Sequence, residues 1–141
     1  EESFRYAEEM QNHLVLKREK ARFFDWIFLG VGLDGHTASL FPGHNLKNSN
    51  KLCETTEHPK TGQRRITMTP LAINNSRRIT YHAIGKKKAE IVFKLATDPS
   101  ASNIFPAAQI RGEWFLDKEA ASRLDLGLIH KLGKKQTIAP K

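Results

Sequence analysis

Cysteine is nearly absent from this sequence of 141 residues, because Cys53 stands alone. A lone cysteine excludes an internal disulfide and a zinc cluster built on several thiolates, and it fits a reducing compartment. No run approaches the roughly 20 apolar residues that cross a bilayer. The N-terminus has neither the basic start nor the apolar core of a signal peptide. We therefore expect a cytoplasmic protein that has no membrane contact.

Aromatic residues are few, at 9% of the sequence, and none interleaves with its lysine clusters. The stacking surface of a single-strand nucleic-acid binder is therefore missing. The formal net charge of +8 still favours anionic partners, and a phosphorylated metabolite satisfies it. We expect solvated surface charge and no nucleic-acid partner. A basic nucleic-acid-binding module remains the alternative, and it would use lysines 86–88 and the tail 131–141.

The composition and the order of periodic segments predict one α/β domain over residues 1–141. Hydrophobic residues make up 39% of the sequence, enough for one core. Residues 44–63 have little periodicity and predict a long exposed loop, and residues 125–141 predict a flexible basic tail. The alternation of strands and helices predicts a largely parallel sheet with helices on both faces. We expect helices at 3–20, 70–73, 86–96 and 118–124, and strands at 24–29, 65–69, 78–84 and 113–116.

A glycine-rich turn follows the first predicted strand. Gly30, Gly32 and Gly35 match the G-x-G-x-x-G pattern of dinucleotide-binding turns. That reading requires a sustained helix after the turn, and Pro42-Gly43 ends any helix too early. Glu54 lies near the distance after the glycines at which the pattern has an acidic residue that binds the ribose. It does not, however, end a predicted strand. Nucleotide binding is therefore disfavoured.

The same turn places chemistry-bearing side chains at the carboxyl end of a strand, where ligands bind in open α/β sheets. His36 can accept a proton near neutral pH, and Asp34 can orient its ring. Gly32 and Gly35 let the backbone approach a ligand closely, so we expect both in the substrate site. By spacing alone, a histidine that only hydrogen-bonds locally in the turn is an equal alternative.

The run from Phe24 to Gly43, FDWIFLGVGLDGHTASLFPG, resembles the signature of the 6-phosphogluconolactonases nearly position for position. Residues 59–69 and 114–121 resemble later parts of the same family. The resemblance implies a Rossmann-like fold shared with sugar-phosphate deaminases and isomerases. It also implies hydrolysis of 6-phospho-D-glucono-1,5-lactone, with no cofactor and no metal.

The resemblance also assigns roles to individual residues. It makes His36 the general base for the attacking water and Lys60 a substrate-binding cation, while Arg65 can pair with phosphate oxygens. We further expect backbone N–H groups of residues 35–37 to stabilise the developing oxyanion. Lys60 departs from the family pattern, because Thr61-Gly62 replaces the usual prolines.

Two alternatives stay open within this family. The related hexosamine-phosphate deaminases carry an acidic residue five positions after the histidine, where this sequence has Phe41. The Ser-Gly-Gly-Ser-type loop and Asp-Glu-Arg motif that family members carry upstream do not occur here. The chain also opens within a predicted helix and without methionine, so we expect part of a longer polypeptide. A truncated homologue that binds sugar phosphate or a partner without turnover is the second alternative, and the oligomeric state is left open.

Overall fold

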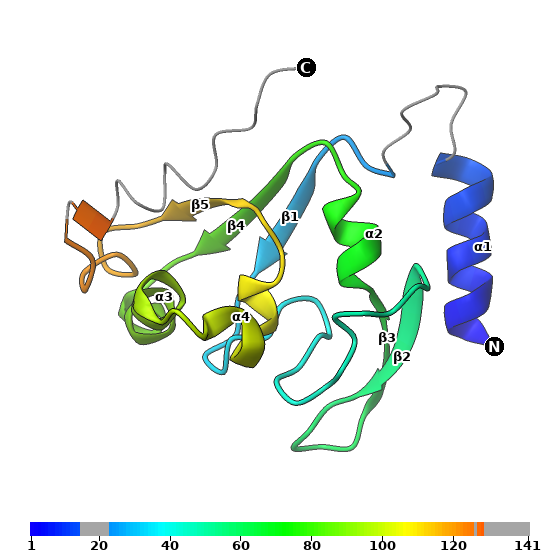
Figure 1. Ribbon diagram of the computed structural model, residues 1–141, viewed down its shortest axis with the longest axis horizontal. Coiled ribbons are helices and arrows are strands. Elements are labelled where there is room, and N and C mark those ends of the chain that lie inside the picture. Colours follow the sequence, from blue (N-terminus) through cyan, green and yellow to red (C-terminus); the bar gives the residue numbers. More distant parts are fainter. Residues whose placement is uncertain (15–22, 126, 129–141) are drawn as a thin grey trace.

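The computed structural model describes residues 1–14, 23–125 and 127–128. Figure 1 shows a central sheet, a separate hairpin and short helices around them. The helices are α1 (Glu2–Leu14), α2 (Pro70–Asn74), α3 (Ala89–Thr97) and α4 (Ala101–Ile104), with 3-10 turns η1 (Lys86–Lys88) and η2 (Pro106–Ala108). The strands are β1 (Ile27–Gly30), β2 (Cys53–Glu57), β3 (Arg64–Met68), β4 (Ile79–Ala83) and β5 (Glu113–Leu116).

The central sheet is parallel and has the order β1-β4-β5. Its register pairs Leu29 with Tyr81 and Tyr81 with Trp114. The inner face forms the main core with residues of α2 and α3, because alternate residues of each strand point to the same side. This arrangement confirms the α/β class and the parallel sheet predicted from the sequence. On the opposite face, Phe28, His82 and Phe115 are exposed.

The prediction of one long loop over residues 44–63 was wrong for residues 53–57. Residues 53–57 form β2, which pairs antiparallel with β3 and places Cys53 opposite Met68. Cys53 and Thr56 are both buried, although they point to opposite faces of β2 and the strand is otherwise polar. The strand predicted at 65–69 exists as β3, but it belongs to this hairpin and not to the parallel sheet.

Helix α1 packs against the β2–β3 hairpin. Met10 is buried with Cys53 and Ala72 in a second, smaller core cluster. In Figure 1, α1 stands beside the hairpin, on the side away from β5. The helix predicted at 3–20 is confirmed as far as Leu14, and residues 15–20 lie outside the described part of the chain.

The segments that follow β4 and β5 differ from the predicted helices. The helix expected at 86–96 begins as η1 and becomes α-helical only at Ala89. The helix expected at 118–124 is a series of turns, in which the Asp117 carboxylate accepts a hydrogen bond from the Ala120 N–H. This bond is the capping contact predicted for Asp117, but the backbone then makes the shorter-range bonds from the Ser122 N–H to Glu119 and from the Leu124 N–H to Ala121, which are those of turns. The predicted basic tail at 125–141 lies almost entirely outside the described residues.

None of the described helices is long and apolar enough to cross a membrane.

Candidate active site

The glycine-rich turn leaves the carboxyl end of β1 and folds back on itself. The Gly32 N–H donates to the carbonyl of His36, and the Gly35 N–H donates to the carbonyl of Gly32. The Thr37 hydroxyl donates to the carbonyl of Gly30 at 2.8 Å. Two hydrogen bonds therefore close the turn, one ties it to the end of β1, and together they fix the position of His36.

Gly32 and Gly35 are required by close approach within this turn. A Cβ atom on Gly32 would lie 2.1 Å from Nδ1 of His36, so the histidine ring rests directly on this glycine. Gly35 has a φ of +82°, and a Cβ there would lie 2.4 Å from the ring of Phe105. Glycine has no Cβ, so it allows the close contact at Gly32 and both the positive φ and the close contact at Gly35. In this structure the two glycines make room for His36 and Phe105; their predicted contact with substrate stays a prediction.

His36 and Asp34 form the pair that the sequence predicted. Nδ1 of His36 lies 2.6 Å from Oδ1 of Asp34. Partial burial raises the pKa of Asp34, but the hydrogen bonds and charge of His36 outweigh it and lower that pKa overall. An ionised carboxylate can only accept, so Nδ1 carries the proton and Nε2 is the unprotonated nitrogen. Nε2 of His36 has no partner among the described residues, and it is therefore placed to accept a proton.

Phe41 is the centre around which several site side chains are packed. Its ring is 1% exposed and lies 5.0 Å from the rings of His36 and His58, measured between centroids. His44 contacts the same ring edge-on at 5.7 Å, and the Arg65 guanidinium lies 5.9 Å from its centroid. One buried aromatic ring thus gathers three histidines and an arginine from the turn and the hairpin. The sequence alone indicates only that Phe41 stands where the related deaminases carry an acidic residue.

The two predicted anion-binding residues are placed differently. Arg65 lies on β3, half-buried beside Phe41, with its guanidinium donating to the side-chain oxygen of Gln63. Lys60 lies exposed at the hairpin tip, where its backbone N–H donates to Nδ1 of His58. The structure therefore brings Arg65 to the same ring as His36. No contact joins the Lys60 side chain to that cluster in the described residues.

Lys88 is a candidate site residue that sequence reasoning missed. It ends η1, is half-buried, and its Nζ donates to the carbonyl of Val31 at the start of the glycine turn. Its neighbours Lys86 and Lys87 are exposed. The available signal was the position of Lys88 just after a strand parallel to β1, because the carboxyl ends of parallel strands meet at one edge of the sheet. The sequence alone predicts solvated charge for all three lysines.

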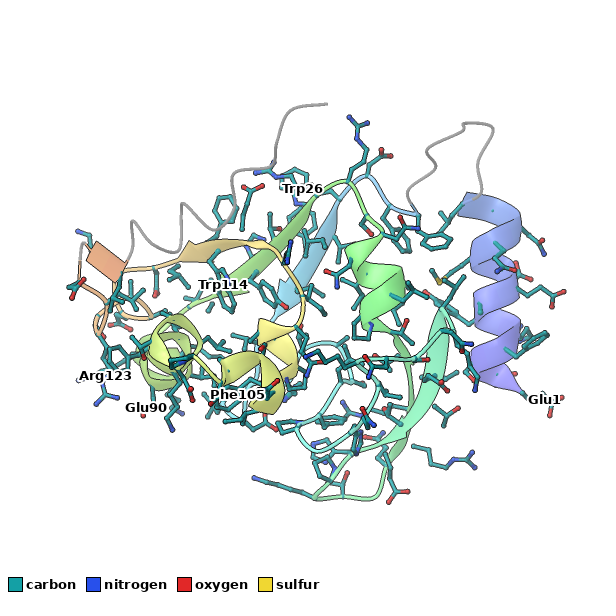
Figure 2. All side chains as sticks on the ribbon, viewed as in Figure 1. Glu1, Trp26, Glu90, Phe105, Trp114 and Arg123 are labelled. Atoms are coloured by element: carbon teal, nitrogen blue, oxygen red, sulfur yellow. The ribbon has the colours of Figure 1, made fainter. Side chains whose placement is uncertain are left out.

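The predicted oxyanion donors are largely used within the turn. The Gly35 N–H binds the Gly32 carbonyl and the His36 N–H binds Oδ1 of Asp34, whereas the bond between Leu40 and Thr37 uses the Thr37 carbonyl and not its N–H. Residues 101–108 support the turn from outside, since the Ala107 N–H donates to the carbonyl of Gly35. Figure 1 shows this cyan turn next to α4, and Phe105 is labelled there in Figure 2. In the described ranges, no group of three or more His, Cys, Asp or Glu could hold a metal ion.

Comparison with known proteins agrees with this geometry. The profile of the family described as glucosamine-6-phosphate isomerases/6-phosphogluconolactonase matches residues 1–116. The 6-phosphogluconolactonases of Aggregatibacter actinomycetemcomitans and Haemophilus influenzae are each 40% identical over 129 residues, covering 82% of this chain and 56% of theirs. The chain belongs to this glucosamine-6-phosphate isomerase/6-phosphogluconolactonase family.

Solved structures extend the similarity to the fold of the family. The crystal structure of a devB protein superposes with a TM-score of 0.79 at 39% identity, covering 88% of this chain and 54% of that one. A monomeric glucosamine-6-phosphate deaminase superposes with a TM-score of 0.64 at 26% identity, over 86% of this chain and 53% of that one. Both branches of the family therefore share this backbone. The chain spans about half the length of the relatives it matches.

Proposed function

We propose that this chain carries the catalytic segment of a 6-phosphogluconolactonase, which hydrolyses 6-phospho-D-glucono-1,5-lactone to 6-phosphogluconate in the oxidative pentose phosphate pathway. The observation that carries the proposal is the His36–Asp34 pair in the glycine turn, with Nδ1 held at 2.6 Å and Nε2 left as acceptor. The relatives at 40% identity bear the lactonase name.

The proposed mechanism uses His36 as base and then as acid. Nε2 takes a proton from water as the water oxygen bonds to the lactone carbonyl carbon, and Asp34 stabilises the charged imidazole ring. The tetrahedral intermediate collapses by breaking the bond from that carbon to the ring oxygen. The proton on Nε2 passes to this departing oxygen, which becomes a hydroxyl. His36 is thereby regenerated, and the product is the open-chain acid.

Two cations near the turn are suited to the anionic substrate. Arg65 offers a planar pair of donors to phosphate oxygens, and Lys88 offers an ammonium at the mouth of the turn. Because the Gly35 and His36 amides are used internally, Lys88 is also a candidate for the developing oxyanion. Lys60 remains a proposed substrate contact on the strength of the family pattern alone.

The test measures lactone hydrolysis above the spontaneous rate. We would compare the chain alone with a chimera in which it is joined to the part of the Haemophilus influenzae relative that it does not match. His36→Ala should lower the rate by about 10²–10⁴-fold, the usual contribution of a general base. His13→Ala, at an exposed position on α1, is the matched control and should leave the rate unchanged. An unchanged rate in folded His36→Ala would refute the assignment of the base.

The non-catalytic alternative makes a different prediction in the same experiment. A homologue that only binds sugar phosphate would show no hydrolysis in either form, yet would bind 6-phosphogluconate. The deaminase alternative predicts ammonia release from glucosamine 6-phosphate. Phe41 argues against it, since this buried ring occupies the place of the deaminase acid.

We also propose that the protein works in the cytoplasm and has no nucleic-acid partner. Support for the first point comes from the lone cysteine: Cys53 is buried against Met10, and burial raises the pKa of its thiol. A buried, protonated thiol is unreactive and needs no oxidising compartment. For the second point, the half-buried Lys88 donates to the Val31 carbonyl, so this member of the lysine cluster is engaged within the chain.

A further inference from the structure

The loop that joins β2 to β3 is closed around His58. The His58 N–H donates to the carbonyl of Gln63, and the His58 carbonyl accepts from the N–H groups of Thr61 and Gly62. We call residues 58–63 the hairpin tip. In Figure 1 it lies at the lower end of the hairpin, beside the cyan segment that follows β1. These backbone bonds give the tip a defined shape, so the half-buried His58 side chain has a fixed base.

The neutral His58 ring carries its proton on Nε2. Its Nδ1 accepts from the backbone N–H groups of Lys60 at 3.2 Å and Thr61 at 3.3 Å. A ring nitrogen that accepts these bonds has no proton, so the N–H of the ring is at Nε2. No described residue accepts a hydrogen bond from Nε2. His58 therefore presents an unused donor at the end of the ring away from the tip.

This donor lies on the side of the hairpin that faces the proposed base. Thr56 pairs with Arg65 in the antiparallel register and precedes His58 by two residues, so the three side chains leave one face of the hairpin. The rings of His58 and His36 each lie 5.0 Å from that of Phe41, so their centroids are no further apart than twice that distance. An extended hexose phosphate spans such a distance. One substrate molecule can therefore contact His36 with its lactone end and His58 with its other end.

The same face of the hairpin has polar groups without a partner. The Thr56 side chain is 6% exposed, and its hydroxyl has no hydrogen-bond partner in the described part of the chain. Buried hydroxyls rarely lack a partner. The Arg65 guanidinium makes one hydrogen bond to a described residue, from Nη2 to the side-chain oxygen of Gln63 at 3.1 Å, so most of its donors are free. The face is thus suited to a ligand rich in acceptor oxygens.

We infer that His58 is a substrate-binding residue that donates from Nε2 to the phosphate group of the sugar phosphate, beside Arg65. The inference rests on the proposed function and deepens it, because it names a residue that recognises the phosphorylated end of the lactone. A neutral donor next to a guanidinium suits this group, since a phosphate accepts several charge-assisted hydrogen bonds at once. The alternative is that His58 only closes the hairpin tip through Nδ1.

Two substitutions of His58 separate its ring nitrogens. His58→Asn keeps an oxygen near the position of Nδ1 but has no donor that reaches the position of Nε2. His58→Gln places an amide donor near Nε2 and loses the acceptor at Nδ1. Calorimetry with 6-phosphogluconate should show about tenfold weaker binding for His58→Asn, because a hydrogen bond to a charged group is lost. His58→Gln should bind nearly as tightly as the unchanged protein.

Kinetics test whether the contact is made to the phosphate. His58→Asn should raise the KM for 6-phospho-D-glucono-1,5-lactone and leave kcat nearly unchanged. The same substitution should not alter any hydrolysis of glucono-1,5-lactone, which has no phosphate. His13→Asn is the matched control at an exposed position on α1, and it should change none of these quantities.

The measurements are made on the chain alone and on the chimera defined above, and binding of 6-phosphogluconate by neither would overturn the inference. Unchanged binding in folded His58→Asn would also overturn it, and so would equal weakening in both His58 variants or equal losses on both lactones. Failure of the proposed function has a different result. Neither form would then hydrolyse the lactone, while the Kd values for 6-phosphogluconate would still decide whether His58 binds the phosphate.

Discussion

At the scale of single residues, the histidine of the turn depends on the residue beneath it. Gly32 has no side chain, and the His36 ring occupies the space that a Cβ would fill. The contact between Gly32 and His36, which lie two residues before and after Asp34, thus determines the position of the proposed base. A change that leaves His36 and Asp34 intact can still displace them.

We predict that Gly32→Ala disables the site. The new methyl group would lie 2.1 Å from Nδ1 of His36, so the ring must move and its bond to Asp34 must lengthen or break. Overpacking of this kind costs about 1–3 kcal/mol of stability. Chemical denaturation and lactone hydrolysis would both report the change. Gly30→Ala is the control, because nothing lies within 4 Å of a Cβ there; equal loss in both variants would contradict the role of close approach.

Lys88 provides a second prediction for a single residue. Lys88→Met should raise the KM for the lactone or lower kcat by about tenfold or more, because it removes a charge-assisted contact at the mouth of the turn. Lys87→Met removes the same charge from an exposed neighbouring position and should leave both constants nearly unchanged. Steady-state kinetics would separate the two variants. Matching losses would mean that only the general positive charge of this segment matters.

At the scale of elements, the site is assembled from three connections. The turn after β1 carries His36, the hairpin brings Arg65 and His58 to Phe41, and the turn after β4 brings Lys88. Asp117 joins the last of these to the end of β5, since its carboxylate accepts from the Gly85 N–H. Gly85 has a φ of +87°, which favours glycine at this junction. Displacement of any of the three connections would remove one chemical group from the site.

The ion pair between β4 and β5 gives a prediction about pH. The hydrogen bond and charge of Arg78 outweigh slight burial and lower the pKa of Glu113. A carboxyl with a lowered folded-state pKa stabilises the fold above its unfolded pKa, and this stabilisation is lost as pH falls through the folded value. Arg78→Met should therefore cost more stability at pH 7 than at pH 3. The difference should be small, since both side chains are substantially exposed.

The control for this prediction is Glu113→Gln. Arg78 also lies over the Trp26 ring, and the loss of that contact does not depend on the charge of Glu113. In the Glu113→Gln background, the cost of Arg78→Met should thus be the same at both pH values. Urea unfolding at pH 3 and pH 7 measures all four proteins. A pH dependence that survives in Glu113→Gln would show that another group is responsible.

At the scale of the whole molecule, the net charge of +8 would attract the proposed anionic substrate. We predict that kcat/KM for the anionic lactone falls as ionic strength rises, while kcat changes little, because salt screens long-range attraction. Stopped-flow or steady-state rates across a salt series would measure this. The same series with labelled single-stranded DNA should show no binding at physiological ionic strength. Salt-sensitive DNA binding there would favour the nucleic-acid module instead.

The sequence by itself determined the features that depend on neighbouring residues. The glycine spacing, the Asp34–His36 pair and the periodic strands β1, β4 and β5 are local, so each is encoded within a short stretch. The family likeness likewise rested mainly on the continuous run over residues 24–43, with shorter matches at 59–69 and 114–121. These predictions agree with the structure because turn geometry and strand alternation need few distant partners.

Only the tertiary structure decided which distant residues meet. The sequence of residues 53–57 predicts a polar loop. In the structure these residues form β2, because β3 pairs with them and α1 covers Cys53. The sequence predicts that Lys88 is one of three solvated lysines. In the structure its position at the end of η1 lets its ammonium group donate to the Val31 carbonyl. Phe41 becomes the centre of the site because hairpin and turn converge on it. Such contacts depend on long-range packing, which no local pattern in the sequence specifies.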